Sequence, residues 1–347
     1  MQLNRRSGIN VKKKFIMGKL LAIFIMSTVL LCGCTIKAPS TTIRVNKEFK
    51  DNEIFYVEEE VCTLGEAKLF LMNQFNLYSN RYGDKIWKAE YEGKPLYTYL
   101  EENVYDFMVR LKSMVLMATG EGIVLSEEDQ RLIDLAANNY YGKLTAAEKT
   151  YTGATIDDVK DAFSDYFLAN KLFAVLTKEA QREISDDEAR VITVQVIFLE
   201  KGNNSLIQEL YQKATRDKED FLTLAETYSK HAWIEGKISR GELPNEVDEA
   251  AFLLTTGEIS RVISCDEGLY LIKCVNNYEK ELTAKHREEL IEKWKREMFK
   301  TEYDSYVRNL YMRVNENVWE SIDFSYTAPT GNVSFYACYD EFLEGNE

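Results

Sequence analysis

Residues 191–199 read Val-Ile-Thr-Val-Gln-Val-Ile-Phe-Leu, and at this point the character of the chain changes. Branched and aromatic side chains favour strands, and a run with so few polar members predicts a buried strand. The patterns that follow predict helices at about 205–215, 218–228 and 246–252, a polar loop from 229 to 241, and strands near 261–264 and 269–275. This stretch therefore predicts a small domain that mixes helices with strands.

Both flanks of this domain read as helix. Between residues 61 and 185, capping residues followed by apolar residues at helical spacing begin at Thr63, Ser126 and Thr155. Another helix is expected over about 96–119, and residues 278–314 predict one long charged helix with an apolar face. Helical segments therefore precede and follow the mixed domain.

The N-terminus has the features of an export signal. A basic segment ends at Lys19, and the apolar run Leu20–Leu31 that follows is shorter than the about 20 residues that span a membrane. Residues 31–34, Leu-Cys-Gly-Cys, resemble a bacterial lipobox, although Cys32 stands where a small residue is usual. We expect cleavage before Cys34 and lipidation of Cys34, which would anchor the chain firmly. The alternative is an uncleaved N-terminal anchor.

These patterns predict the following organisation. There is a signal peptide at 1–33, a flexible membrane-proximal stem at 34–60, a helical region at 61–188, the mixed domain at 189–277, a C-terminal helix at 278–325 and an acidic, loosely ordered tail at 326–347.

Charge and composition exclude several kinds of partner. The net charge of the chain is −14, and six of its basic residues lie in 1–33, so the remainder carries −20. Such a body repels nucleic acid, whose binding rests on Lys and Arg. The two histidines, His231 and His286, are far apart in sequence, and the cysteines have no zinc-ligand spacing. We expect no nucleic-acid partner, no metal site and no cofactor.

Five blocks in the mixed domain resemble the parvulin-type (PpiC-like) peptidyl-prolyl isomerases. In the family's order and spacing, they are Asp220–Ser229 (DFLTLAETYS), Ser239–Leu243 (SRGEL), Asp248–Phe252 (DEAAF), Thr256–Ser260 (TGEIS) and Gly268–Lys273 (GLYLIK). The layout of the whole chain is similar to the PrsA/SurA-type extracytoplasmic foldases. This resemblance implies an α+β fold, in which an all-helical chaperone lobe of N-terminal helices plus the C-terminal helix carries an inserted, small parvulin-like α/β domain with an antiparallel-type sheet.

The departures from the family's motifs fall on its polar groups. Active parvulins carry a histidine in the first strand and another in the last strand, and here these positions hold Val196 and Tyr270. His231 lies where the family supplies a cysteine or an aspartate. Tyr270 and His231 are therefore the candidate catalytic residues by replacement. The alternative is that Tyr270 is an ordinary strand aromatic and His231 a solvated loop residue.

The apolar proline pocket of the family is partly kept. The resemblance places it at Leu243, Val247 and Phe252, with Val247 standing where phenylalanine is usual. Isomerisation forms no covalent bond, and its barrier of about 18–20 kcal/mol comes from amide resonance. A catalyst must therefore bind the twisted amide more tightly than the planar one. The retained pocket does part of this work, whereas most of the family's polar groups are absent.

The resemblance implies a lipid-anchored foldase or holdase at the extracytoplasmic face of the cell membrane. Its partners would be unfolded or newly exported polypeptides, the membrane through the lipid on Cys34, and a second copy in a homodimer. Prolyl isomerase activity is expected to be weak or lost. Two alternatives stay open, namely an active isomerase with degenerate motifs, or a non-catalytic scaffold that recognises one specific partner.

Overall fold

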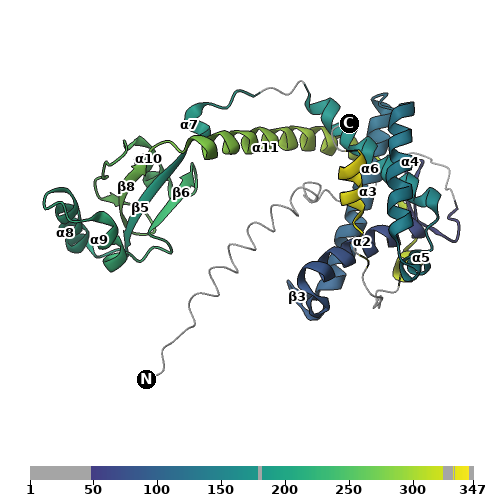
Figure 1. Cartoon of the computed structure of the whole chain (residues 1–347), viewed down its shortest axis with the longest axis horizontal. Helices are drawn as coiled ribbons and strands as arrows, with labels where there is room; N and C mark the ends of the chain where they lie inside the picture. The colour runs from purple at the N-terminus through teal and green to yellow at the C-terminus, as the bar shows by residue number, and fades with distance from the viewer. Residues whose placement is uncertain (1–47, 179–181, 323–330, 332, 344–347) are drawn as a thin grey trace. The chain divides into compact units, whose positions relative to one another are not determined.

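The computed structural model describes residues 48–178, 182–322, 331 and 333–343. Contacts between Cα atoms divide the chain into a helical unit, residues 1–179 with 298–347, and a sheet unit, residues 180–297 (Figure 1). The predicted signal peptide, the lipidation site at Cys34 and the first part of the stem lie outside the described residues. Within the described part of the chain, we find no helix with the length and apolar character needed to cross a membrane.

The helical unit opens with a small sheet where a flexible stem was expected. β1 (Glu53–Val57) pairs antiparallel with β2 (Glu60–Thr63) on one side and with β9 (Met312–Val314) on the other. Ile54, Phe55 and Val57 have no exposed surface. The prediction of a flexible stem up to residue 60 is therefore wrong for residues 53–60, because the apolar run of β1 is buried in the core.

Helices form the body of the same unit, and most begin where capping residues predict. They are α2 (Leu64–Tyr82), α3 (Leu96–Gly120), α4 (Glu127–Lys143), α5 (Ala146–Thr152) and α6 (Ile156–Thr177). Ser126 and Thr155 form reciprocal capping boxes with the third residue of α4 and of α6, and the Thr63 hydroxyl accepts a hydrogen bond at the start of α2. The 3₁₀ helix η1 (Asp84–Lys88) and the hairpin β3 (Glu90–Tyr91) and β4 (Lys94–Pro95) connect α2 to α3.

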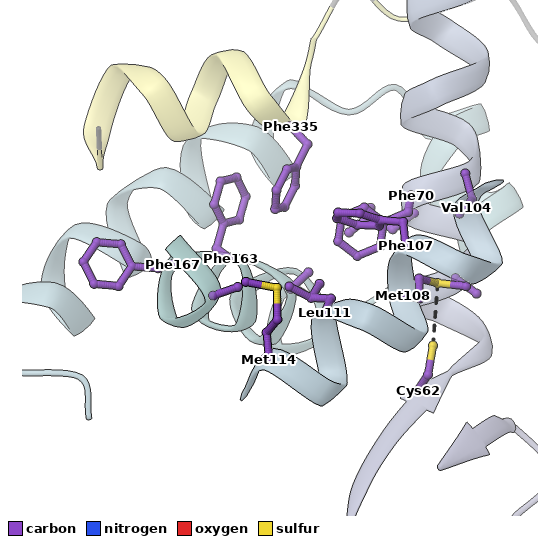
Figure 2. Close-up of a cluster of buried hydrophobic side chains, with 14 of the residues drawn as sticks. Cys62, Phe70, Val104, Phe107, Met108, Leu111, Met114, Phe163, Phe167 and Phe335 are labelled. Atoms are coloured by element: carbon purple, nitrogen blue, oxygen red, sulfur yellow. Dashed lines mark hydrogen bonds between the residues drawn. The ribbon is translucent and has the colours of Figure 1, made fainter. Parts of the chain in front are cut away.

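The core of the helical unit is completed from the far end of the sequence. Phe335, at the start of α13 (Phe335–Phe342), stacks on Phe163 with ring centroids 4.1 Å apart and lies edge-on to Phe70 at 5.3 Å (Figure 2). Its backbone N–H donates to Asn73 Oδ1 at 2.8 Å. The prediction of a loosely ordered tail at 326–347 is therefore wrong for residues 333–343, because their aromatic side chains outweigh their acidic character and pack into this core.

The long charged helix is shorter than predicted. α11 (Lys280–Val307) ends before residue 314, and the chain continues into β9 and the short helix α12 (Glu316–Glu320). Phe299, Tyr303 and Val307, near the end of α11, belong to the core of the helical unit. The start of α11 is tied to the sheet unit, where Thr283 Oγ1 accepts a hydrogen bond from the Val191 N–H at 3.0 Å and His286 Nδ1 lies 2.8 Å from the Ala189 carbonyl oxygen.

Three charged side chains are buried together inside the helical unit. The Lys112 ammonium lies 3.0 Å from Glu66 Oε1 and 2.5 Å from Asp165 Oδ2, and all three residues are buried. Two carboxylates thus share one cation out of contact with water. Burial, which Lys112 only partly offsets, raises the pKa of Glu66 to about 7.

The sheet unit is a four-stranded antiparallel sheet with helices on it. After the short helix α7 (Asp186–Ala189), the strands are β5 (Val191–Leu199), β6 (Glu235–Ser239), β7 (Ile263–Ser264) and β8 (Leu269–Asn276), in the order β6-β5-β8-β7. The helices are α8 (Asn204–Thr215), α9 (Phe221–Tyr228) and α10 (Asn245–Leu253). The predicted α+β fold with an antiparallel sheet is confirmed. The polar loop predicted over 229–241 is wrong in part, because β6 occupies its second half and pairs with β5 along five residues.

The two faces of this sheet have separate apolar cores. Alternate residues of β5 point to opposite faces, so Val194 and Val196 join one core while Ile197 and Leu199 join the other. The core at Val196 also takes in α10 and Tyr270 of β8, and the core at Ile197 is covered by α8 and α9. Every candidate pocket residue named from the sequence lies in the first of these cores.

Candidate functional site

The two central strands of the sheet unit place Val196 and Tyr270 close together on one face. In the antiparallel register of β5 and β8, Phe198 lies opposite Tyr270 and Val196 lies opposite Ile272. Val196 and Tyr270 are therefore diagonal neighbours, and both belong to the same apolar core. The positions at which active parvulins carry histidines thus come together here, but with an apolar side chain and a phenol.

The hydroxyl group of Tyr270 is already engaged. It donates a hydrogen bond to Glu267 Oε2 at 3.0 Å, from the turn just before β8. Burial and the neighbouring Glu267 carboxylate raise the pKa of Tyr270, so the phenol stays protonated at neutral pH. Its single O–H donor is directed to Glu267 and not toward a bound carbonyl. Glu267 was not predicted from the sequence, because it lies in a turn three positions before Tyr270 and belongs to none of the family's motifs.

His231 lies beside Tyr270, in the loop between α9 and β6. Their ring centroids are 6.2 Å apart, and the His231 ring is 4.5 Å from that of Trp233 and edge-on to it. His231 Nδ1 is 2.9 Å from the Trp233 carbonyl oxygen and 3.4 Å from the Trp233 backbone nitrogen, so the imidazole is held against the backbone of Trp233. The structure therefore brings together the two candidate catalytic residues, and it adds Trp233 to them.

Trp233 was not identified from the sequence, although the glycine three positions after it, Gly236, is a signal for it. Its indole ring lies against Gly236, where an added Cβ would stand 3.1 Å from the ring. Glycine at this position gives the indole room to lie flat on the strand. We refer to Phe198, His231, Trp233 and Tyr270 as the aromatic cluster of the sheet unit, because successive ring centroids lie 4.5 to 6.4 Å apart.

The three residues predicted to line a proline pocket are packed into an apolar core. Leu243, Val247 and Phe252 lie in one core with Tyr270. All three are buried, and Val247 has no exposed surface. The guanidinium groups of Arg240 and Arg190 lie over the Phe252 ring, 4.5 Å and 5.3 Å from its centroid. A ligand can reach Val247 only if side chains around it move.

The thiols near this face are poor nucleophiles. Cys265 and Cys274 are free and buried, and burial raises the pKa of the Cys274 thiol. A protonated, buried thiol attacks slowly, because the thiolate is the reactive form. No group of three or more His, Cys, Asp or Glu side chains suited to a metal ion occurs among the described residues. The apolar core and buried thiols at this face are suited to packing and to non-covalent contacts.

Three kinds of similarity to known proteins bear on this site. Residues 200–276 match the family model of the rotamase, PPIC-type PPIASE domain. A foldase protein PrsA from Caldanaerobacter subterraneus is 26% identical over 209 residues, which cover 55% of this chain and 62% of that protein. A foldase protein PrsA from Oceanobacillus iheyensis is 32% identical over 135 residues, which cover 37% of this chain and 44% of that protein. The chain thus spans about three fifths or less of the length of these two relatives.

Among solved structures, the crystal structure of peptidylprolyl isomerase PrsA from Bacillus cereus is 17% identical, and the match covers 74% of this chain and 96% of that one. Its TM-score of 0.38 is too low to support an argument about the arrangement of the chain. The similarity in sequence, and not the superposition, therefore relates residues 200–276 of the sheet unit to the PPIC-type domain.

Proposed function

We propose that this chain, which is related in sequence to the PrsA-type foldases, is a lipid-anchored extracytoplasmic foldase that binds unfolded exported polypeptides and has weak or no prolyl isomerase activity. The observation that carries the foldase assignment is the match of 200–276 to the PPIC-type family within a chain similar to PrsA over a longer stretch. The catalytic part of the proposal rests on the site itself.

Weak catalysis follows from the state of the polar groups. Val196 offers no hydrogen bond, and the Tyr270 hydroxyl donates to Glu267. The oxygen of a twisting amide needs a hydrogen-bond donor, and neither of the two family histidine positions supplies one that is not already engaged. Loss of preorganised donors of this kind costs about 10²–10³ in rate each. We therefore expect kcat/KM to lie at least about a hundredfold below that of an active parvulin.

The direct test is cis-to-trans conversion of a short prolyl peptide, measured beside an active parvulin. Comparable rates would favour the alternative of an active isomerase with degenerate motifs. Tyr270→Phe and His231→Ala then identify the group responsible, since Tyr270 and His231 are the candidate polar groups at the site. Loss of activity in either variant would assign the catalytic role that the sequence suggested.

Client binding is tested separately from catalysis. The foldase assignment predicts that the chain suppresses the aggregation of several unrelated unfolded proteins, with or without isomerase activity. Suppression of none, together with tight binding of one native protein, would favour the scaffold alternative. The aggregation assay is independent of isomerase activity, because its clients can be chosen so that no prolyl bond limits their folding.

Anchoring rests on the lipobox-like residues 31–34. Cys34→Ala is expected to prevent lipid attachment and cleavage at this point, and to release the chain from the membrane fraction in the cell of origin or in a Gram-positive host. Mass spectrometry measures lipid attachment and cleavage, and fractionation measures release from the membrane. A variant processed like the unaltered chain would disprove lipidation at Cys34.

We also propose that residues 189–277 fold as a domain inserted into the helical lobe. The start of α11 makes contacts that stabilise this domain, since Thr283 binds the first residue of β5 and His286 binds the residue just before Arg190. A fragment of residues 182–297 is therefore expected to unfold cooperatively and at a higher temperature than a fragment of 189–278. Absence of a cooperative transition in both would contradict an independent domain.

A further inference from the structure

A group of aromatic side chains is left open to solvent at one end of the helical unit. It comprises Tyr82 near the end of α2, Trp87 of η1, Tyr91 of β3, and Tyr97 and Tyr99 in the first turn of α3. The hairpin of β3 and β4 lies at the same end (Figure 1). We call these five residues the aromatic tip.

Within the aromatic tip, Tyr91 contacts Tyr99, while Tyr82 and Trp87 lie against aromatic rings of α2. Trp87 stacks on Phe75 of α2 with ring centroids 4.2 Å apart, and Phe75 in turn packs against the core of the helical unit. Tyr91 and Tyr99 lie 4.6 Å apart. Tyr82, Tyr91 and Tyr97 are 47%, 46% and 41% exposed. Neither η1 nor the hairpin has a buried residue, so this end of the unit contributes contact surface and little core.

An exposed group of tyrosines is suited to binding polypeptide. Tyrosine has a large apolar ring with a polar hydroxyl, costs little conformational entropy to order, and is enriched at protein interfaces. The ring face also attracts the cationic groups of Lys and Arg. The tip therefore offers three surfaces that accept either an aromatic or a basic side chain.

Charge favours a basic partner over a membrane. Glu92 lies beside Tyr91, where its carboxylate raises the pKa of the phenol. Residues 81–102 hold five acidic and four basic residues, so the tip itself has almost no net charge. The chain beyond residue 33 carries −20, a field that repels anionic lipid and draws basic segments toward the surface.

We propose that the aromatic tip binds extended, non-native polypeptide segments that carry aromatic side chains together with Lys or Arg. This inference rests on the proposed foldase function and names the client chemistry and the surface that would recognise it. The rings would contact aromatic and basic side chains, and the acidic body would raise the rate of encounter.

The test compares two triple variants of the full chain. Tyr82→Ser, Tyr91→Ser and Tyr97→Ser remove the exposed rings of the tip. Val124→Ser, Leu135→Ser and Val175→Ser are the matched control, because these apolar residues of the same unit are 67%, 44% and 48% exposed. Fluorescence anisotropy measures the binding of a short unstructured peptide of Tyr and Arg, and of the same peptide with Glu in place of Arg. Circular dichroism confirms that both variants keep their helix content.

We expect the unaltered chain and the control to bind the Tyr/Arg peptide at least about tenfold more tightly than the Tyr/Glu peptide, and the tip variant to lose about tenfold in affinity for the Tyr/Arg peptide. Tyr→Phe at the same three positions should restore most of the binding. Equal binding by the tip variant and the control would overturn the proposal. So would a change confined to self-association or to binding of anionic vesicles, since the occupant would then be a second copy or a membrane.

Failure of the proposal can be told apart from failure of the foldase function. If the tip variant and the control suppress client aggregation equally well and bind the peptides equally, the foldase function stands and the tip is not its client site. If no form of the chain suppresses aggregation or prefers the basic peptide, the tip proposal and the foldase function both fail.

Discussion

The two units each carry a group of aromatic side chains, and the groups are built in opposite ways. In the sheet unit, Phe198 and Tyr270 pack in the interior, and the Tyr270 hydroxyl is bonded to Glu267. In the helical unit, Tyr82, Tyr91 and Tyr97 are nearly half exposed. Buried rings that pack on one another have little surface free to contact a substrate. Exposed rings can still bury surface when a partner binds. Under the proposed function, the sheet unit is the one with reduced catalysis, and the helical unit is the one that binds clients.

The interiors of the units differ as well. The helical unit buries Lys112 between Glu66 and Asp165, while the core of the sheet unit around Val196 is apolar. A buried charge cluster depends on all of its members, since removal of one leaves an uncompensated charge. An apolar core tolerates the loss of single contacts more gradually. The two units should therefore respond differently to single substitutions and to pH.

The largest effect is expected from Lys112→Met. The change leaves Glu66 and Asp165 buried without a cation, and should destabilise the helical unit by about 3–5 kcal/mol. Chemical denaturation, followed by circular dichroism, measures the loss. The control is Lys160→Met in the same unit, whose partner Asp134 is partly exposed, so its removal should cost less than about 1 kcal/mol. Equal effects of the two variants would show that the buried cluster is no more important than a surface ion pair.

An intermediate effect is expected from restoring the family's histidines. Val196→His together with Tyr270→His places two imidazoles on one face of adjacent strands. The change also removes the phenol that donates a hydrogen bond to Glu267. We expect kcat/KM for prolyl isomerisation to rise at least about tenfold, or about 1.4 kcal/mol in the barrier. The control is Val194→His with Tyr270→His, which puts one imidazole farther along β5. An equal gain in the control, or none in either, would mean that these positions do not limit catalysis.

The smallest effect concerns pH. The pKa of Glu66 is raised to about 7 in the folded chain against 4.5 for the free side chain, so between these values the folded state binds a proton that the unfolded state releases. The free energy of unfolding of the helical unit should therefore increase by about 0.7 kcal/mol as the pH falls from about 7.5 to about 6.5.

Denaturation at several pH values checks this prediction, and Glu66→Gln should flatten the dependence. Part of it should remain, because burial also raises the pKa of Glu101, to about 7, with the same sign. A stability that decreases on acidification would contradict the assignment. The core around Val196 contains no comparable group among the residues assigned to it, so the sheet unit should change less.

Local signals in the sequence predicted much of the fold. Ser126 and Thr155 predict helix starts through side chains that bond three residues away, and residues 191–199 form a strand that is buried at every position except Phe198. β9 and α13 were missed for the opposite reason. Their partners, Phe55 for Val314 and Phe163 for Phe335, are far away in the sequence, and each segment is too short to show a period.

The candidate site was predicted unevenly for similar reasons. The resemblance located Tyr270, His231 and the residues of the apolar pocket, because each falls in or beside a motif. It could not predict that Glu267 binds the Tyr270 hydroxyl, since that contact depends on the conformation of a turn. Nor could it predict that Val247 is fully covered, because burial reflects how neighbouring side chains pack and not the motif alone.

The way in which the end of the sequence completes the helical unit has a consequence for folding during synthesis. β1 obtains one of its two partner strands from residues 312–314, and the aromatic core receives Phe335. A chain synthesised from its N-terminus therefore cannot complete this unit until nearly all of it has been made, whereas residues 180–297 are complete earlier. The unit that is begun first is the last to finish folding.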